Sequence, residues 1–134
     1  MYDMTEDSSF DNNILVKELI NNFSSQGLEI AHADYGGYSK PTEVKNYRPD
    51  IVGWDNEKQL CHLGIVETDS EKLKDLKTAE QFYELSNLIM SKGESKGKLC
   101  PLYIAVPEKH KTILEQRLVD LGLSNRKNVQ ALGV

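Results

Sequence analysis

Long apolar runs are missing from this sequence. No stretch approaches the ~18 consecutive apolar residues of a membrane-spanning helix. The first residues, MYDMTEDSSFDNN, are acidic and polar, without the basic start and apolar core of a signal peptide. We therefore expect a cytoplasmic protein with no membrane contact, in which residues 1–10 are a flexible N-terminus and residues 11–134 form a single domain.

Cysteine is also scarce, with two residues, Cys61 and Cys100. Both fall within predicted strands and neither belongs to a CxxC pair or a Cys/His cluster, so we expect two reduced, buried thiols and no structural zinc. The Walker phosphate loop and the GxSxG nucleophile motif are absent too. His62 is predicted to face away from the acids discussed below and to be a core residue.

The net charge of −5 leaves little positive charge for coating nucleic acid non-specifically. It is compatible with an enzyme that acts on nucleic acid, because a local basic rim is sufficient and acidic metal ligands add negative charge. The loop 40–48 carries three basic residues and Tyr47. It is either a contact for a phosphate backbone or an ordinary solvated loop.

Hydrophobic periodicity predicts an α/β protein. Helical spacing indicates helices over 11–23, 70–92 and 108–121, and apolar runs bounded by turn residues indicate strands over 28–34, 49–54, 60–68, 99–106 and 129–134. This order predicts an antiparallel meander followed by crossovers through helices, and hence a mixed sheet. The expected helix caps are Asp11, Asn12 or Asn13 and Ser70 at the starts, and Gly27, Gly93 and Gly122 at the ends.

An acidic residue lies at one end of each of two adjacent apolar strands. Asp50 opens the first strand and Glu67 closes the second. Two hairpin registers are compatible with the sequence. A turn at about 55–60 places Asp50 opposite Ile65 and makes Glu67 its diagonal neighbour, roughly 7–8 Å away. A tighter turn would leave the two acids too far apart.

In the first register the two carboxylates lie close enough to bind one divalent cation. Oxygen ligands suit a hard ion, Mg²⁺ or Mn²⁺, and the backbone carbonyl of Thr68 adds a further ligand. In the alternative interpretation Asp50 and Glu67 are ordinary strand ends in water.

These residues carry a family resemblance. Pro49-Asp50, Glu67-Thr68-Asp69 and the element order resemble the PD-(D/E)xK nuclease superfamily, in the style of its Holliday-junction-resolvase-like and RecB-like members. The resemblance covers about residues 11–106. It implies a restriction-endonuclease-like αβββαβ core with a mixed central sheet flanked by helices, followed by a C-terminal helix and a short strand.

The resemblance also implies function. The expected cofactor is Mg²⁺ or Mn²⁺, held by Asp50, Glu67 and Thr68, and the expected partner is nucleic acid, with DNA as the substrate. Glu18 falls where many members place an additional acid, and Gln81 resembles a glutamine of the helix after the motif. Junction-cleaving relatives are dimers, so a homodimer is the expected assembly.

One position departs from the family pattern. The motif lysine should occupy position 69, where this chain has Asp69. Lys77 is a candidate replacement, because it lies four residues before Gln81 and shares its helical face. Lys72 and Lys74 are others, and all three are also compatible with a solvated helix face. Asp69 is either a third metal ligand or a sign that catalysis has been lost.

Three functional hypotheses follow. The first is a metal-dependent phosphodiester hydrolase acting on DNA, in which a lysine of the second helix, Glu18 or Asp69 orients or deprotonates the attacking water. The second is a catalytically inactive binding or assembly module of the same fold. The third is an unrelated α/β domain that binds a protein, in which Asp50 and Glu67 would not converge.

Overall fold

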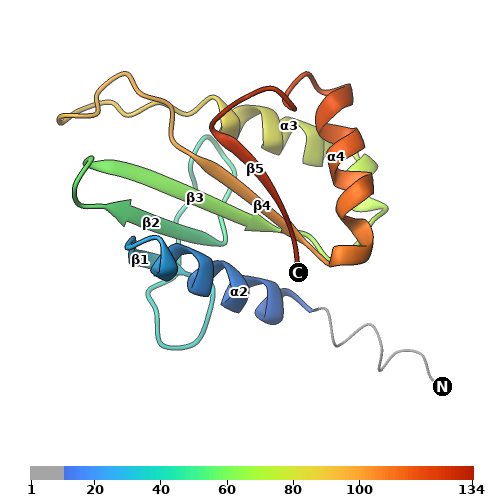
Figure 1. Cartoon of the computed structure of the whole chain (residues 1–134), viewed down its shortest axis with the longest axis horizontal. Coiled ribbons are helices and arrows are strands. Elements are labelled where there is room, and N and C mark those ends of the chain that lie inside the picture. The colour runs from blue at the N-terminus through green and yellow to red at the C-terminus, as the bar shows by residue number, and fades with distance from the viewer. Residues whose placement is uncertain (1–10) are drawn as a thin grey trace.

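The computed structural model describes residues 11–134, so the predicted flexible N-terminus lies outside the described residues. A mixed five-stranded sheet in the order β1-β2-β3-β4-β5 forms the centre of the molecule (Figure 1). β1, β2 and β3 are antiparallel neighbours, and β3, β4 and β5 run parallel. The elements are α2 (Asn12–Ser25), β1 (Glu29–Ala33), β2 (Ile51–Asp55), β3 (Leu60–Val66), α3 (Leu76–Ser86), β4 (Leu102–Val106), α4 (Lys111–Asp120) and β5 (Val129–Gly133), with 3₁₀ turns at Lys72–Lys74 and Glu108–His110.

The α/β class, the element order and the mixed sheet predicted from the sequence are therefore confirmed. Within residues 11–134, none of the helices has the length and apolar character needed to cross a membrane.

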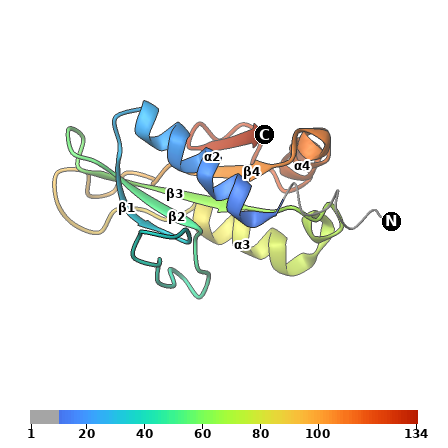
Figure 2. The same ribbon diagram turned by 90° about the horizontal axis from the view of Figure 1, so that it is seen from below.

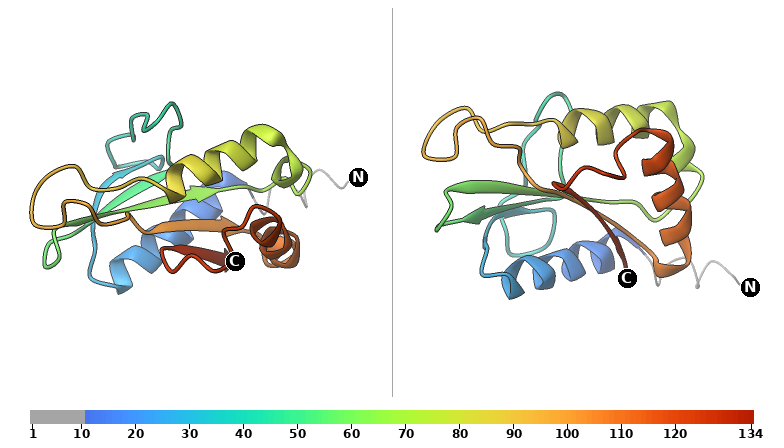
Figure 3. Two further views of the ribbon diagram at one scale, coloured as in Figure 1. Left: turned by 90° about the horizontal axis from the view of Figure 1, so that it is seen from above. Right: turned by 45° about the horizontal axis from the view of Figure 1, so that its top comes forward.

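Helices cover both faces of the sheet. α2 and α3 lie on opposite faces (Figures 2 and 3), and α4 contributes to the same hydrophobic core as α3. The core on the α3 and α4 side is built from alternate residues of β3 and β4, such as Leu63 and Ile104, with Phe82 and Leu114 from the helices. Alternation along the strands sends Ile51 and Tyr103 to the α2 side.

α2 forms as the sequence predicts. Asp11 caps its start, with the side chain accepting the Ile14 N–H at 3.1 Å, and Gly27 follows its end with φ +82°. Leu19 and Phe23 lie on its buried face. This face comes close to the sheet because β2 and β3 carry glycines there. A Cβ at Gly53 would come within 2.6 Å of the Phe23 ring.

His62 is a core residue on the α2 side, as predicted. Its Nδ1 lies 3.0 Å from the Tyr103 hydroxyl, and that hydroxyl donates to the Gln26 side chain at 3.2 Å. Burial lowers the pKa of His62, so its imidazole is neutral near pH 7.

The prediction of one helix over 70–92 is wrong. A 3₁₀ turn precedes α3, and α3 ends at Ser86, so neither Ser70 nor Gly93 caps it. The end has a local cause and a long-range cause. The side chains of Ser86 and Asn87 both donate to the Tyr83 carbonyl, which competes with the helical backbone pattern. The carbonyl of Ser86 is then bound by Arg126 and Asn128 from the segment before β5.

Residues 87–101 instead form an excursion that runs from the end of α3 to the start of β4. Ile89 pairs with Leu99, and the Met90 N–H donates to the Lys98 carbonyl at 2.9 Å. The Ser95 hydroxyl donates to the Gln59 carbonyl, which ties this excursion to the β2–β3 turn. β4 consequently starts at Leu102 rather than at residue 99.

The predictions for the two cysteines are corrected by this arrangement. Cys100 is buried but precedes β4, whereas Cys61 lies in β3 but is only half-buried. Both are free thiols.

Candidate functional site

The hairpin register decides whether the predicted acids converge. Ile51 pairs with Gly64, and the turn between β2 and β3 spans residues 56–59. Extending the register by one residue places Asp50 opposite Ile65, which is the first of the two predicted registers. Glu67 directly follows β3, and its negative charge raises the pKa of Asp50. The two acids therefore lie within electrostatic reach at one end of the sheet.

Asp50 is held firmly at the start of β2. Its N–H donates to the Gly64 carbonyl at 2.8 Å, and its Oδ2 accepts the Val66 N–H at 2.9 Å. Burial raises the pKa of Asp50 to about 6, and the negative charges of Asp34 and Glu67 add to this effect. The Val66 hydrogen bond and the Arg48 guanidinium act in the opposite direction. The Asp50 carboxylate is thus oriented by the backbone, but the positive charge of Arg48 does not offset its burial and the two neighbouring negative charges.

Asp34 is a site acid that the sequence analysis missed. Ala33 pairs with Ile51, so Asp34 is the next partner of Asp50, and its N–H donates to the Asp50 carbonyl at 2.8 Å. Asp34, Asp50 and Glu67 consequently stand at the ends of three adjacent strands. The available signal was the acid that closes the predicted strand 28–34, read together with the pairing of that strand to the hairpin.

Two basic side chains of the loop 40–48 neutralise Asp34. The Arg48 guanidinium lies 3.1 Å from the Asp34 carboxylate, and the Lys40 ammonium lies 3.6 Å from it. Both cations remain well exposed. They form a basic rim beside the three acids.

Glu67 and Asp69 are joined by short-range hydrogen bonds. The Glu67 Oε2 accepts the Asp69 N–H at 3.0 Å, and the Asp69 Oδ1 accepts the Glu71 N–H at 2.9 Å. Asp69 therefore supports the turn that leads into Lys72–Lys74, a role that a lysine could not perform. This gives a local structural reason for aspartate at position 69.

The structure does not join the other predicted residues to this centre by hydrogen bonds or ion pairs among residues 11–134. Glu18 is exposed on α2 and lines a hollow of about 330 Å³ with Leu132, Gly133 and Val134 of the β5 end. β5 ends at the same end of the sheet as β3, since these strands are parallel to β4. Within residues 11–134, no hydrogen bond or ion pair joins Glu18, Lys77 or Gln81 to the Asp50 and Glu67 carboxylates.

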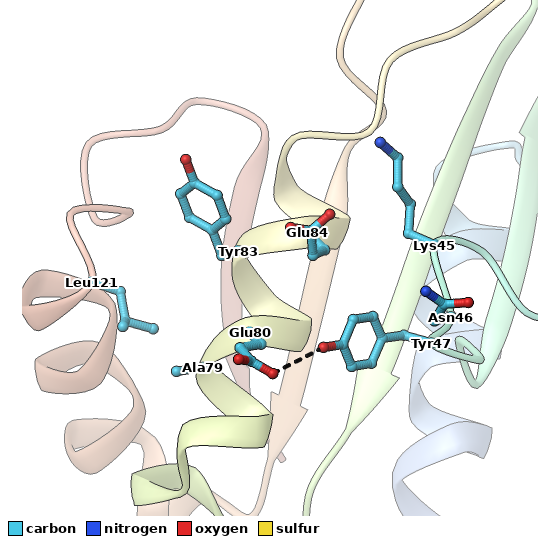
Figure 4. A pocket seen from close by; sticks show the side chains of 8 residues that line it. All are labelled: Lys45, Asn46, Tyr47, Ala79, Glu80, Tyr83, Glu84 and Leu121. Carbon is cyan, nitrogen blue, oxygen red and sulfur yellow. Dashed lines mark hydrogen bonds between the residues drawn. The ribbon is translucent and has the colours of Figure 1, made fainter.

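α3 nevertheless borders the site loop. The turn from Val44 to Tyr47 lies against it, and the Tyr47 hydroxyl donates to Glu80 at 3.4 Å (Figure 4). Desolvation, with the charges of Glu80 and Glu84, raises the pKa of Tyr47. Between this turn and the helix runs an open groove of about 540 Å³. Two glutamates and two tyrosines line it beside a single lysine, so its net charge is negative, which does not suit a phosphate backbone.

The oxygen atoms of Asp50, Glu67 and Thr68 are the candidate ligands of the expected cation. Among the described residues, no group of three or more His, Cys, Asp and Glu side chains is arranged to hold a metal ion. Asp50 and Glu67 each keep one carboxylate oxygen free of the hydrogen bonds above. Mg²⁺ is commonly bound by one or two carboxylates and retains several waters. The free oxygens of the two acids, and the carbonyl of Thr68 next to Glu67 in the sequence, are donors of the kind that such an ion takes.

Comparison with protein-family models finds no match, and neither do comparisons with curated proteins and with solved structures.

Arg48 offers a direct check of the site electrostatics. Replacing Arg48 by Gln removes a positive charge that lowers the pKa of Asp50, so this pKa should rise above its value of about 6. The measurement is an NMR titration of the Asp50 carboxyl carbon. Lys92→Gln, which removes an exposed lysine of the 87–101 excursion, is the control and should leave the titration unchanged. An unchanged Asp50 pKa in Arg48→Gln would contradict the described placement of Arg48.

Proposed function

We propose that this protein is a metal-dependent phosphodiester hydrolase of the PD-(D/E)xK type that acts on DNA. The observation that carries the proposal is the hairpin register, which places Asp50 opposite Ile65 and makes Glu67 its diagonal neighbour, so that the two negative charges repel each other. A cation between the carboxylates would relieve this repulsion. The element order and the mixed sheet support the assignment to a restriction-endonuclease-like core.

Asp50 and Glu67 would hold Mg²⁺ or Mn²⁺ through their free carboxylate oxygens, with the Thr68 carbonyl as a third protein ligand. The bound ion would supply a Lewis acid for the scissile phosphate. Lys77 of α3, or one of the acids Glu18 and Asp69, would orient or deprotonate the attacking water.

Arg48 supports the proposal, because it places a positive charge beside the acids where the motif lysine is missing. Its guanidinium binds Asp34 and lowers the pKa of Asp50, so it lies within electrostatic reach of both. Its side chain is also exposed enough to bind a phosphate oxygen. We assign Arg48, with Lys40 next to it, to the binding of the DNA backbone.

The second candidate is a catalytically inactive module of the same fold that binds nucleic acid or a metal ion. It is favoured by Asp69, whose carboxylate is committed to the Glu71 N–H and carries the opposite charge to the motif lysine.

The test combines metal binding with cleavage. Mn²⁺ and Mg²⁺ are titrated calorimetrically into the wild type, Asp50→Asn and Asp55→Asn, and the same proteins are then incubated with plasmid and branched DNA. Asp55 ends the same strand at its far end and accepts the N–H groups of the turn, which asparagine can also do, so Asp55→Asn is a matched control.

We expect metal binding in the wild type and in Asp55→Asn, and none in Asp50→Asn. Metal-dependent cleavage should fall at least ~100-fold in Asp50→Asn, because even changes outside the ligand shell reduce activity by about 10–100-fold. Metal binding without cleavage by the wild type would favour the second candidate. No metal binding by the wild type would overturn the proposal and leave the acids as ordinary strand ends.

A further inference from the structure

The two cysteines are neighbours on adjacent strands, at the end of the sheet opposite to Asp50. β3 and β4 are parallel, with Leu63 opposite Leu102. Continuing this register back by two residues places Cys61 opposite Cys100. Neighbouring strands lie about 4.8 Å apart, and the Cα atoms of disulfide-bonded cysteines are typically ~4.4–6.8 Å apart. The backbone spacing therefore suits a bond between them.

The two thiols also influence each other's ionisation. The neighbouring Cys100 thiol lowers the pKa of the Cys61 thiol. The same interaction, together with burial, raises the pKa of Cys100. Cys61 is accordingly the thiol that ionises first, and the thiolate is the reactive form of cysteine.

Of the two cysteines, Cys61 is the one that reagents in solvent can reach. Both cysteines line an apolar groove of about 510 Å³ formed by Trp54 and the start of the 87–101 excursion. Cys61 is half-buried, whereas Cys100 is 1% exposed. A small reagent that enters the groove meets Cys61 first. Lys92, which also lines the groove, adds a positive charge that favours an anionic reagent.

We propose that Cys61 and Cys100 form a dithiol site that reacts with low-molecular-weight disulfides and closes into an intramolecular disulfide. Cys61 is the attacking thiol and Cys100 the resolving thiol. The proposal is independent of the phosphodiester hydrolase activity proposed above.

The exchange balances in two steps. The Cys61 thiolate attacks one sulfur of the small disulfide, the disulfide bond breaks, and one small thiolate leaves. The pKa of Cys100 then falls, because Cys61 no longer carries a charge. Cys100 loses its proton to solvent, and its sulfur attacks the Cys61 sulfur, which releases the second small thiolate. Two protein thiols are oxidised by two electrons, and one small disulfide is reduced to two thiols.

A bond here would fasten the base of the 87–101 excursion to β3. Cys100 ends this excursion, and its N–H donates to the Leu88 carbonyl at 2.9 Å. The tip of the excursion is already tied to the β2–β3 turn through Ser95 and Gln59. Oxidation would therefore restrain the segment at its base as well as at its tip.

The experiment uses the full-length chain, reduced and then exposed to oxidised glutathione, with intact mass and free-thiol titration as readouts. The wild type should lose both thiols, lose the mass of two hydrogen atoms and keep no glutathione. Cys100→Ser should accumulate a stable glutathione adduct on Cys61, and Cys61→Ser should stay unreactive. Trp54, the single tryptophan, lines the same groove, so its emission should change only in the wild type and in Cys100→Ser.

A wild type that retains glutathione, that forms disulfide-linked dimers or that keeps both thiols would overturn the proposal. Phenylarsine oxide, which bridges neighbouring thiols, provides a test that needs no variant. One molecule should block both cysteines of the wild type and be removed by a dithiol but not by a monothiol. Failure of the arsenical to block both thiols would equally overturn the proposal.

Discussion

Asp50→Asn is expected to stabilise the folded protein at pH 8 while it abolishes metal binding. The folded-state pKa of Asp50 is raised from 3.8 to about 6, so ionised Asp50 opposes folding. Since one pKa unit corresponds to about 1.4 kcal/mol, the cost at pH 8 is roughly 3 kcal/mol. Asparagine carries no charge and keeps an oxygen that can accept the Val66 N–H, so it avoids most of this cost.

The sign of the pH dependence follows from the direction of the shift. A raised carboxyl pKa means that the folded state binds its proton more tightly than the unfolded state. The contribution of Asp50 to stability is therefore fully present below about pH 4 and is lost as the pH rises through about 6. The difference between Asp50→Asn and the wild type should accordingly be small at pH 4 and largest above pH 7.

Urea unfolding of both proteins at several pH values between 4 and 8 measures this difference. Asp55→Asn is again the control, and its difference from the wild type should not increase over the same interval. If Asp50→Asn were less stable than the wild type by the same amount at every pH, the Asp50 carboxylate would stabilise the fold rather than oppose it. A substitution that stabilises the fold but removes metal binding is expected where a carboxylate serves ligand binding at the expense of stability.

Phe23→Ala should lower the free energy of unfolding by about 3–5 kcal/mol, because it leaves a cavity between α2 and the sheet. Phe23 is fully buried, and its ring centroid lies 4.8 Å from that of Tyr103 in an edge arrangement. Gly53→Ala should cost about 1–3 kcal/mol by overpacking against the same ring. The space opposite Gly53 is filled by Phe23, so the two changes should not be additive.

A double-mutant cycle followed by urea unfolding tests this coupling. Gly53→Ala should be less destabilising in the Phe23→Ala background than in the wild type. Tyr83→Ala, which truncates an aromatic side chain that is 54% exposed, is the matched control and should change stability by less than about 0.5 kcal/mol. Strict additivity of Phe23→Ala and Gly53→Ala would show that Gly53 is constrained by something other than the ring.

The sequence narrowed the hairpin to two registers because pairing depends on local features, and the structure selects the first of them. Alternation of side chains and an even number of turn residues put Asp50 and Glu67 on one face, and the pairing of Ile51 with Gly64 agrees. The end of α3 was not accessible, because it depends on Arg126, a residue 40 positions beyond Ser86. A helical pattern within one segment carries no information on such a partner.

Asp34 was missed for a related reason. Its position beside Asp50 depends on how β1 pairs with β2, and that pairing contains an irregularity between Ile30 and His32. A bulge shifts the register by one residue and changes which side chains share a face. Counting along the sequence therefore cannot pair Asp34 with Asp50, although the acid itself is visible at the end of the predicted strand.

The order of strands has a consequence for how the chain reaches this structure. β1, β2 and β3 follow one another without an intervening helix, whereas β4 and β5 join the sheet only after crossovers through α3 and α4. Contacts between near neighbours close with less loss of chain entropy, so the meander is expected to form before the parallel strands. Pulsed hydrogen exchange should protect amides of β2 and β3 earlier than those of β5. Asp34, Asp50 and Glu67 all belong to this early part, so folding would bring the three carboxylates together while the C-terminal third of the chain is still unstructured.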